Sequence, residues 1–219
     1  MINEDYVKVP LVFPTTDQTS TSSSDIFSMK NYGHADIYIT VGTFEDEAAV
    51  TLNKSAAVAA ATVALAFTKY FSTGCILKYT TPSVDTVAAK DETISGAGGA
   101  AATLYKDTGS SLIMHSFNGT TFVTGETVTL SGGKTVVADG IQINEDIMVP
   151  RTAASNTFDL DDVDNRQYCI PIDASDLGEG YDCAQVEIAT MDTVSHIAVD
   201  VILSKPRYPA EIPETAIYD

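Results

Sequence analysis

Apolar and polar residues alternate in residues 35–41, which read Ala-Asp-Ile-Tyr-Ile-Thr-Val. Because side chains alternate between the two faces of a strand, this near period of two predicts a half-buried β-strand rather than a helix. A second strand is predicted to begin near Gln167, in the run Gln-Tyr-Cys-Ile-Pro-Ile-Asp of residues 167–173. Further strands are predicted from Asp25 onward, at Phe27–Met29 and at Ala48–Leu52. The alanine-rich segment Ser55–Ala66 is ambiguous: a short helix or a loop at 55–61, followed by a strand, fits its residues.

The middle of the chain has a different pattern. Residues 80–150 are rich in Gly, Thr, Ala and Ser, and the short strands predicted there are 85–88, 101–105, 112–115, 127–131 and 135–138. Turn-forming residues separate them, including the glycine-rich run at 95–99. Closely spaced short strands predict a small β-barrel or sandwich. We therefore expect an all-β protein in which residues 25–79 and 151–205 form one discontinuous, jelly-roll-like sandwich, with residues 80–150 inserted as a second β domain.

Both ends of the chain contain prolines among apolar residues. Residues 1–24 include Pro10 and Pro14, and residues 206–219 include three prolines between positions 206 and 213. Proline disfavours a sheet interior, so we expect two extended terminal arms, with fraying ends as the alternative. The apolar and aromatic side chains expected to contact neighbouring subunits are Val7, Val9, Leu11, Phe13, Tyr208, Ile212 and Ile217.

The charge balance restricts the classes of partner. The chain has 12 Lys and Arg against 30 Asp and Glu, a net charge of −18. Nucleic-acid binding is not expected, because phosphate contacts require clustered basic residues. Solubility alone is an alternative explanation of the acidity. The most apolar stretch, Ala56–Phe67, is too short to span a bilayer, and the N-terminus lacks a signal-peptide pattern. We expect the protein to be made in the cytoplasm and not to associate with a membrane.

One run of carboxylates is the strongest candidate for a metal site. Asp159, Asp161, Asp162 and Asp164 place oxygen ligands at closely spaced positions, and calcium prefers such ligands. The run lacks the glycine turn and the distal glutamate of an EF-hand loop. A solvated acidic turn before the strand that begins near Gln167 is the simpler interpretation, so we expect no metal and no cofactor.

No catalytic constellation is predicted. Ser195 and His196 are adjacent on a predicted strand, so their side chains point to opposite faces and cannot form a nucleophile–base pair. The run Gly96-Ala97-Gly98-Gly99 lacks the Gly-Lys-Ser/Thr of a phosphate-binding loop and predicts a hairpin turn. Three cysteines cannot build a disulfide framework, although Cys169 and Cys183 lie on predicted strands that we expect to be neighbours. We expect a protein without enzymatic activity.

The segment from Thr157 to Tyr208 carries a family resemblance. It contains an acidic segment, then Tyr168-x-Ile-x-Ile-Asp173, then Tyr181-Asp-Cys183, and a last β-patterned run that ends in Pro206-Arg-Tyr208. In this order the motifs resemble the C-terminal half of auxiliary head proteins of tailed bacteriophages, the capsid decoration or cement proteins. The resemblance covers roughly residues 8–75 and 155–210, and most such relatives lack the insert or have a shorter one.

The resemblance implies a structural protein of the virion, located on the capsid surface. Its expected partners are the major capsid protein and other copies of itself, since trimers are common among such proteins. Two alternatives stay open from the sequence: a tail, neck or short-fibre component of the virion, and a surface adhesion or sugar-binding β domain.

Overall fold

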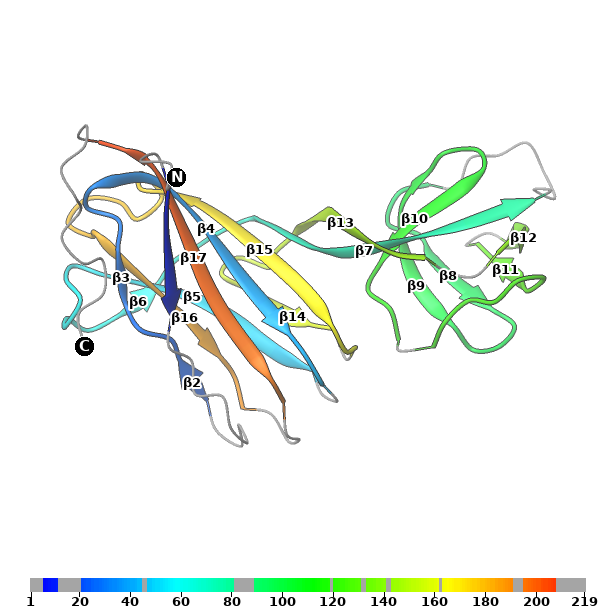
Figure 1. The fold of residues 1–219 in the computed structure, drawn as a ribbon, viewed down its shortest axis with the longest axis horizontal. Coiled ribbons are helices and arrows are strands. Elements are labelled where there is room, and N and C mark those ends of the chain that lie inside the picture. Colours follow the sequence, from blue (N-terminus) through cyan, green and yellow to red (C-terminus); the bar gives the residue numbers. More distant parts are fainter. Residues whose placement is uncertain are drawn as a thin grey trace. The chain divides into compact units, whose positions relative to one another are not determined.

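The computed structural model describes residues 6–11, 21–44, 47–80, 89–118, 120–130, 133–140, 143–161, 163–190 and 195–207. These residues form β-strands and no α-helix, which confirms the all-β prediction (Figure 1). The chain divides into two compact units. The first comprises Met1–Phe71, Pro150–Leu160 and Asp164–Asp219, and the second comprises Ser72–Val149 and Asp161–Val163.

The first unit is a sandwich of two antiparallel sheets. One sheet has the order β1 (Tyr6–Leu11), β17 (Ile197–Pro206), β4 (Tyr32–Val41), β15 (Arg166–Asp173) and the start of β7 (Lys69–Thr80). The other has the order β14 (Thr157–Leu160), β5 (Ala48–Ser55), β16 (Cys183–Ile188) and β2 (Ser22–Ser23), with β3 (Phe27–Ser28) on β16 and β6 (Val63–Ala64) on β5. The prediction of a β-sandwich is confirmed, and its jelly-roll connectivity stays a prediction.

The alternation predicted from the sequence gives each strand one apolar face, and these faces form the core of the sandwich. On β4, Ile37, Ile39 and Val41 are buried while Asp36 and Thr40 face outward. Strands β15 and β17 flank β4 in antiparallel register and turn their own apolar residues to the same side. Buried residues of β5, β14 and β16 complete one continuous core. Burial of about 25 cal/mol for each square ångström of apolar surface makes this core the main stabilising term of the unit.

The predicted N-terminal arm is wrong for residues 6–11, which form the edge strand β1. They pair with β17 along their whole length, from Tyr6 opposite Ser204 to Leu11 opposite Val199. Val9 is only 4% exposed, and Val7 packs partly buried against the same core. Pro10 and Lys8 do not oppose this pairing, because proline and lysine are typical of edge strands, where they discourage further pairing.

Residues 21–24 also belong to the sandwich rather than to an arm. Ser22 and Ser23 pair with β16, and the Ser24 hydroxyl accepts a hydrogen bond of 3.1 Å from the Val186 N–H. Phe13, Tyr208, Ile212 and Ile217 lie outside the described residues, as does the side chain of Leu11. For these positions the predicted arm contacts stay predictions.

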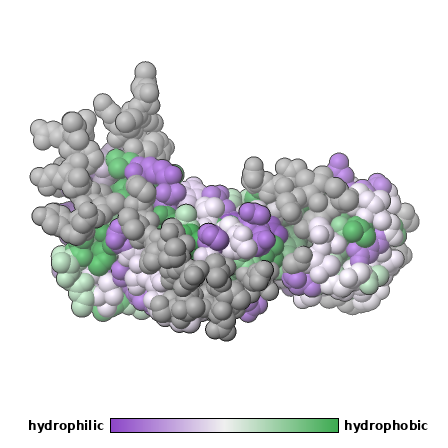
Figure 2. All heavy atoms as spheres, turned by 60° about the horizontal axis from the view of Figure 1, so that its bottom comes forward, coloured by the Kyte–Doolittle hydropathy of each residue, from purple (hydrophilic) through white to green (hydrophobic). Residues whose placement is uncertain are grey.

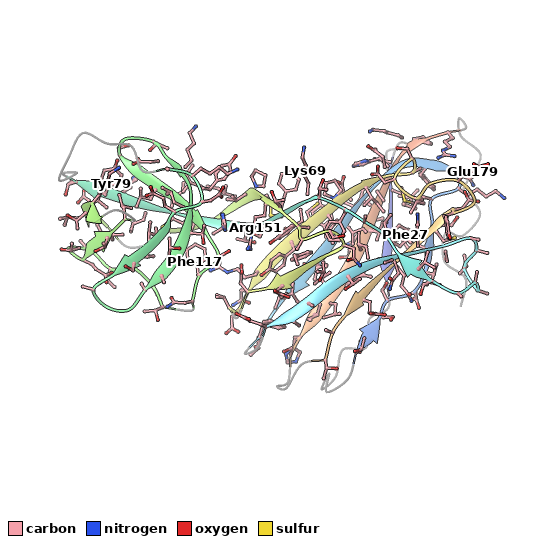
Figure 3. All side chains as sticks on the ribbon, turned by 180° about the vertical axis from the view of Figure 1, so that it is seen from behind. Phe27, Lys69, Tyr79, Phe117, Arg151 and Glu179 are labelled. Carbon is pink, nitrogen blue, oxygen red and sulfur yellow. The ribbon has the colours of Figure 1, made fainter. Side chains whose placement is uncertain are left out.

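The second unit is a ring of antiparallel strands. Its order is β7, β10 (Ser111–His115), β9 (Ala101–Asp107), β8 (Thr93–Gly96), β11 (Thr127–Thr129) and β12 (Thr135–Ala138), and β12 pairs back to β7. This closure leaves none of these strands as a free edge. The unit has its own core, separate from that of the sandwich, and Figure 3 shows Tyr79 and Phe117 among its strands.

The chain enters the second unit in β7 and returns in β13 (Ile143–Thr152), and these two strands pair with each other. The unit begins at Ser72 rather than near residue 80, because β7 is one continuous strand whose residues from Cys75 onward belong to the second core. Gly74 is required there: a Cβ at this position would collide with Val149 and come within 2.9 Å of the Met114 carbonyl oxygen.

An aromatic cluster holds both strands at the sandwich. The Tyr70 ring of β7 stacks on the Phe158 ring, with 3.9 Å between centroids. The Arg151 guanidinium of β13 lies over the same Tyr70 ring, 5.1 Å from its centroid. Stacking and cation–π contacts of this kind are each worth on the order of 1 kcal/mol. They fix the points at which the chain leaves the sandwich and re-enters it.

Two smaller predictions can be compared with the structure. Residues 56–62 form bends and turns without a helix, and the strand that follows is the short β6. Cys169 lies on β15 and Cys183 on β16, which belong to different sheets, so the expectation that their strands are neighbours is wrong. All three cysteines are buried.

Candidate functional site

Of the aspartates singled out as a calcium candidate, the described ones, Asp159, Asp161 and Asp164, belong to no group placed to hold a metal ion. Asp159 is exposed on β14, and Asp162 lies outside the described residues. The Asp164 carboxylate accepts a hydrogen bond of 2.7 Å from the Phe44 N–H, so it closes the loop that follows β4. In the part of the chain that the structure describes, no group of three His, Cys, Asp or Glu residues is placed to hold a metal ion.

Backbone hydrogen bonds connect the loops at the end of the sandwich where β4 ends. The Gly42 N–H donates to the His196 carbonyl at 2.8 Å, and the Asn165 N–H donates to the Gly42 carbonyl at 2.8 Å. Asn165 has a φ of 56°, a conformation that asparagine tolerates better than most residues. The acidic turn predicted before β15 is therefore a structural cap, and Asp164 acts in it as an acceptor for main-chain donors.

At the opposite end of the same sheet, a polar network joins three strands. The His34 ring of β4 lies between two carboxylates, with Nδ1 at 2.8 Å from an oxygen of Asp173 and Nε2 at 3.2 Å from an oxygen of Asp36. Lys205 of β17 lies 3.5 Å from the same oxygen of Asp173. The hydrogen bond from His34 is the largest cause that holds the pKa of Asp173 below its usual range. Sequence analysis did not identify this network.

Cys169 lies beside this network, on the outward face of β15. Its Sγ is 4.0 Å from Asp36, and burial followed by the negative charge of Asp36 raises its pKa to about 12. A thiol that ionises only in strong alkali is a poor nucleophile at neutral pH, since the thiolate is the reactive form. The geometry therefore assigns Cys169 a packing role.

Among the described residues of the second unit, Glu126 has a buried carboxylate. Its Oε1 accepts a hydrogen bond of 2.5 Å from the Gly98 N–H, and its Oε2 accepts one of 3.1 Å from the Val123 N–H. The glycine-rich run is the hairpin turn between β8 and β9, as predicted, and Glu126 fills the space that a side chain at Gly96 would need. Because these glycines have no side chain, the turn leaves room for the Glu126 carboxylate.

Side chains on the surface are mostly polar. Among the described residues, only Val63, Val123 and Val137 are large hydrophobic residues with high exposure. Figure 2 shows the green apolar areas interrupted by pale and purple residues. The described part of the chain contains no helix that is long and apolar enough to cross a membrane.

Comparisons with known proteins add no relative: no protein-family model, no curated protein and no solved structure matches this chain.

Proposed function

We propose that this protein is a non-enzymatic structural component of a tailed-phage virion, a decoration or cement protein that binds the outer face of the capsid shell. The observation that carries the proposal is the ordered set of motifs between Thr157 and Tyr208. In the fold these residues supply β14, β15, β16 and β17, which contribute to both sheets of the sandwich.

The motif positions have clear physical roles. Tyr168, Ile170 and Ile172 are buried core residues of β15, and Cys183 is buried at the start of β16. The Arg207 N–H, just after β17, donates to the Asn31 carbonyl at 2.9 Å. The motifs therefore describe how the sandwich is built, and the resemblance that supports the proposal lies in residues that form the sandwich rather than in a binding site.

Such a protein would act by mass action. A subunit that binds assembled shell and not free capsid protein stabilises the assembled state, and a symmetric shell repeats the same binding position many times. The net charge of −18 favours the outer face, because packaged DNA would repel an acidic surface inside. We assign the apolar part of the contact to Phe13, Tyr208, Ile212 and Ile217, since Val7 and Val9 pack in the sandwich.

A capsid-binding assay tests the proposal. Recombinant full-length chain is mixed with expanded capsids that lack it, and the bound fraction is measured by co-sedimentation. We expect saturable binding by the full chain and loss of binding after removal of residues 208–219, a deletion that spares every described strand. Tyr105→Ala, a change on the outward face of β9 in the second unit, serves as the control and should bind like the full chain.

Absence of binding by the folded full chain would contradict the proposal. The number of copies in each virion separates decoration from a tail, neck or short-fibre position, because only decoration uses the repeated positions of the shell. Binding to a glycan array instead would support the sugar-binding alternative.

A further inference from the structure

Two exposed valines of the second unit lie on neighbouring segments. Val123 is 54% exposed and Val137 is 36% exposed, and Val63 of the sandwich is the remaining large hydrophobic residue with high exposure among those described. The Gly125 N–H donates to the Ala138 carbonyl at 2.8 Å. The turn that contains Val123 therefore borders the end of β12, where Val137 lies.

The backbone around Val123 is fixed by hydrogen bonds to one residue. The buried Glu126 carboxylate accepts the Val123 N–H at 3.1 Å, and the Glu126 N–H donates to the Val123 carbonyl at 3.1 Å. Gly125 permits this turn, with a φ of 81°. A side chain that projects from a fixed backbone loses little conformational freedom on binding, which favours Val123 as a contact residue.

The surroundings of the two valines carry no net charge. On the outward face, Val137 of β12 lies between Thr80 of β7 and Thr127 of β11. One position further along, the exposed Lys78 and Asp139 are neighbours, because the Asp139 N–H donates to the Lys78 carbonyl at 2.8 Å. We call this surface the valine patch; it consists of Lys78, Thr80, Val123, Thr127, Val137 and Asp139.

The charges of the valine patch fit a second copy of the chain. Each copy has a net charge of −18, so two copies repel each other wherever their acidic surfaces come within about 10 Å at 0.1 M salt. A two-fold contact brings the same surface of both copies together, and that surface must be complementary to itself. One lysine and one aspartate meet this condition, since Lys78 of each copy can face Asp139 of the other.

We infer that two copies of this chain bind each other through their valine patches about a two-fold axis. Val123 and Val137 form the centre of the contact, and two crossed pairs of Lys78 with Asp139 form its rim. The patch is small and has no aromatic residue, so the contact belongs to the weak class that buries less than about 1,200 Å². It does not depend on capsid binding, and a measurement without capsids tests it separately.

Sedimentation velocity of the full chain, from about 1 µM to about 200 µM, measures the association in the range expected for a weak interface. We expect a dimer whose fraction rises with concentration. Val137→Asp should weaken this dimer by about tenfold or more, because it places two carboxylates at the centre of the contact. Val63→Asp is the matched control: it adds the same charge at a 45% exposed valine of the sandwich and should dimerise like the wild-type chain.

Two charge variants test the crossed pairs. Lys78→Asp gives each patch two carboxylates, and Asp139→Lys gives each patch two ammonium groups, so each variant alone should dimerise about tenfold more weakly than the wild-type chain. Mixed in equal amounts, the two variants should form a heterodimer, because every crossed pair then joins opposite charges. A lysine–aspartate pair within one copy would not produce this rescue.

A wild-type chain that stays monomeric over the whole concentration range overturns the inference. So does a dimer that Val137→Asp leaves intact, or one that Val63→Asp weakens equally. It is also overturned if the two charge variants associate no better when mixed than when separate.

Discussion

Replacing Val9 by alanine tests whether residues 6–11 form a core strand or a free arm. Val9 is 4% exposed and lies opposite Val201 of β17. The change removes two methyl groups, each worth about 0.8 kcal/mol when buried, and leaves a small cavity. We expect a loss of about 2 kcal/mol from the free energy of unfolding of the sandwich. Residues in a free arm would lose almost nothing on the same change.

Lys8→Ala is the matched control on the same strand. Its side chain is 63% exposed, and its ion pair with Asp200 is of the exposed kind that contributes about 0–1 kcal/mol. Val9→Asp should cost considerably more than Val9→Ala, because it buries an unpaired charge. The ranking Val9→Asp, then Val9→Ala, then Lys8→Ala follows from the alternation of β1.

Urea denaturation followed by far-UV circular dichroism measures these losses, since the chain has no Trp to act as a fluorescent reporter. The Val9 variants should shift the unfolding of the sandwich and leave that of the second unit unchanged, because the two cores share no residue. Equal stability of Val9→Ala and Lys8→Ala would refute the assignment of residues 6–11 to the sheet.

Three further predictions concern the second unit. Glu126→Gln should lower its stability by about 1–3 kcal/mol in urea denaturation, because the amide group can satisfy only one of the two main-chain donors; an unchanged midpoint would count against the buried carboxylate. Gly74→Ala should cost about 1–3 kcal/mol through its collision with Val149, measured by the same assay, and equal stability would mean that β7 and β13 are less closely packed. Burial, followed by the hydrogen bond to Asp107, raises the pKa of Tyr79 to about 12. The stabilisation by the protonated Tyr79 is therefore complete below the ordinary tyrosine pKa of about 10 and is lost as the pH rises toward the higher value. Tyr79→Phe should therefore lose less stability than the wild-type chain over this alkaline range. An identical loss in both proteins would contradict this prediction.

Much of the fold could be predicted from local patterns. The strand predicted at 135–138 is β12 with the same bounds, and the alternation at 35–41 is the buried face of β4. These predictions succeed because each strand buries one face, and burial of one face imposes a period of two on the sequence. The glycines after β8 likewise predict the hairpin turn that the structure shows there.

The edge strand β1 could not be predicted in this way. Its two apolar residues before Pro10 are too few to establish a period, and proline argued for an arm. Whether a proline-containing segment lies at a sheet edge or leaves the sheet depends on the partner strand, here β17, which is almost 200 residues away in the sequence. The start of the second unit was misplaced for a related reason, since β7 continues through both units without a break.

The polar networks were beyond local patterns altogether. His34 and Asp173 are separated by 139 residues, and only the register of β4 against β15 places them side by side. Glu126 reaches a glycine 28 residues earlier, across the second unit. A single carboxylate or histidine in a strand pattern indicates an outward-facing residue, and its partner becomes visible only when the sheet order is known.

Cryo-electron microscopy of phage particles purified from cells that express this chain tests the central proposal most directly. The account predicts density for the sandwich and for the second unit on the outer face of the shell, repeated at equivalent positions between capsomers. Density confined to the portal or tail axis, or absence of the chain from the particles, would contradict it.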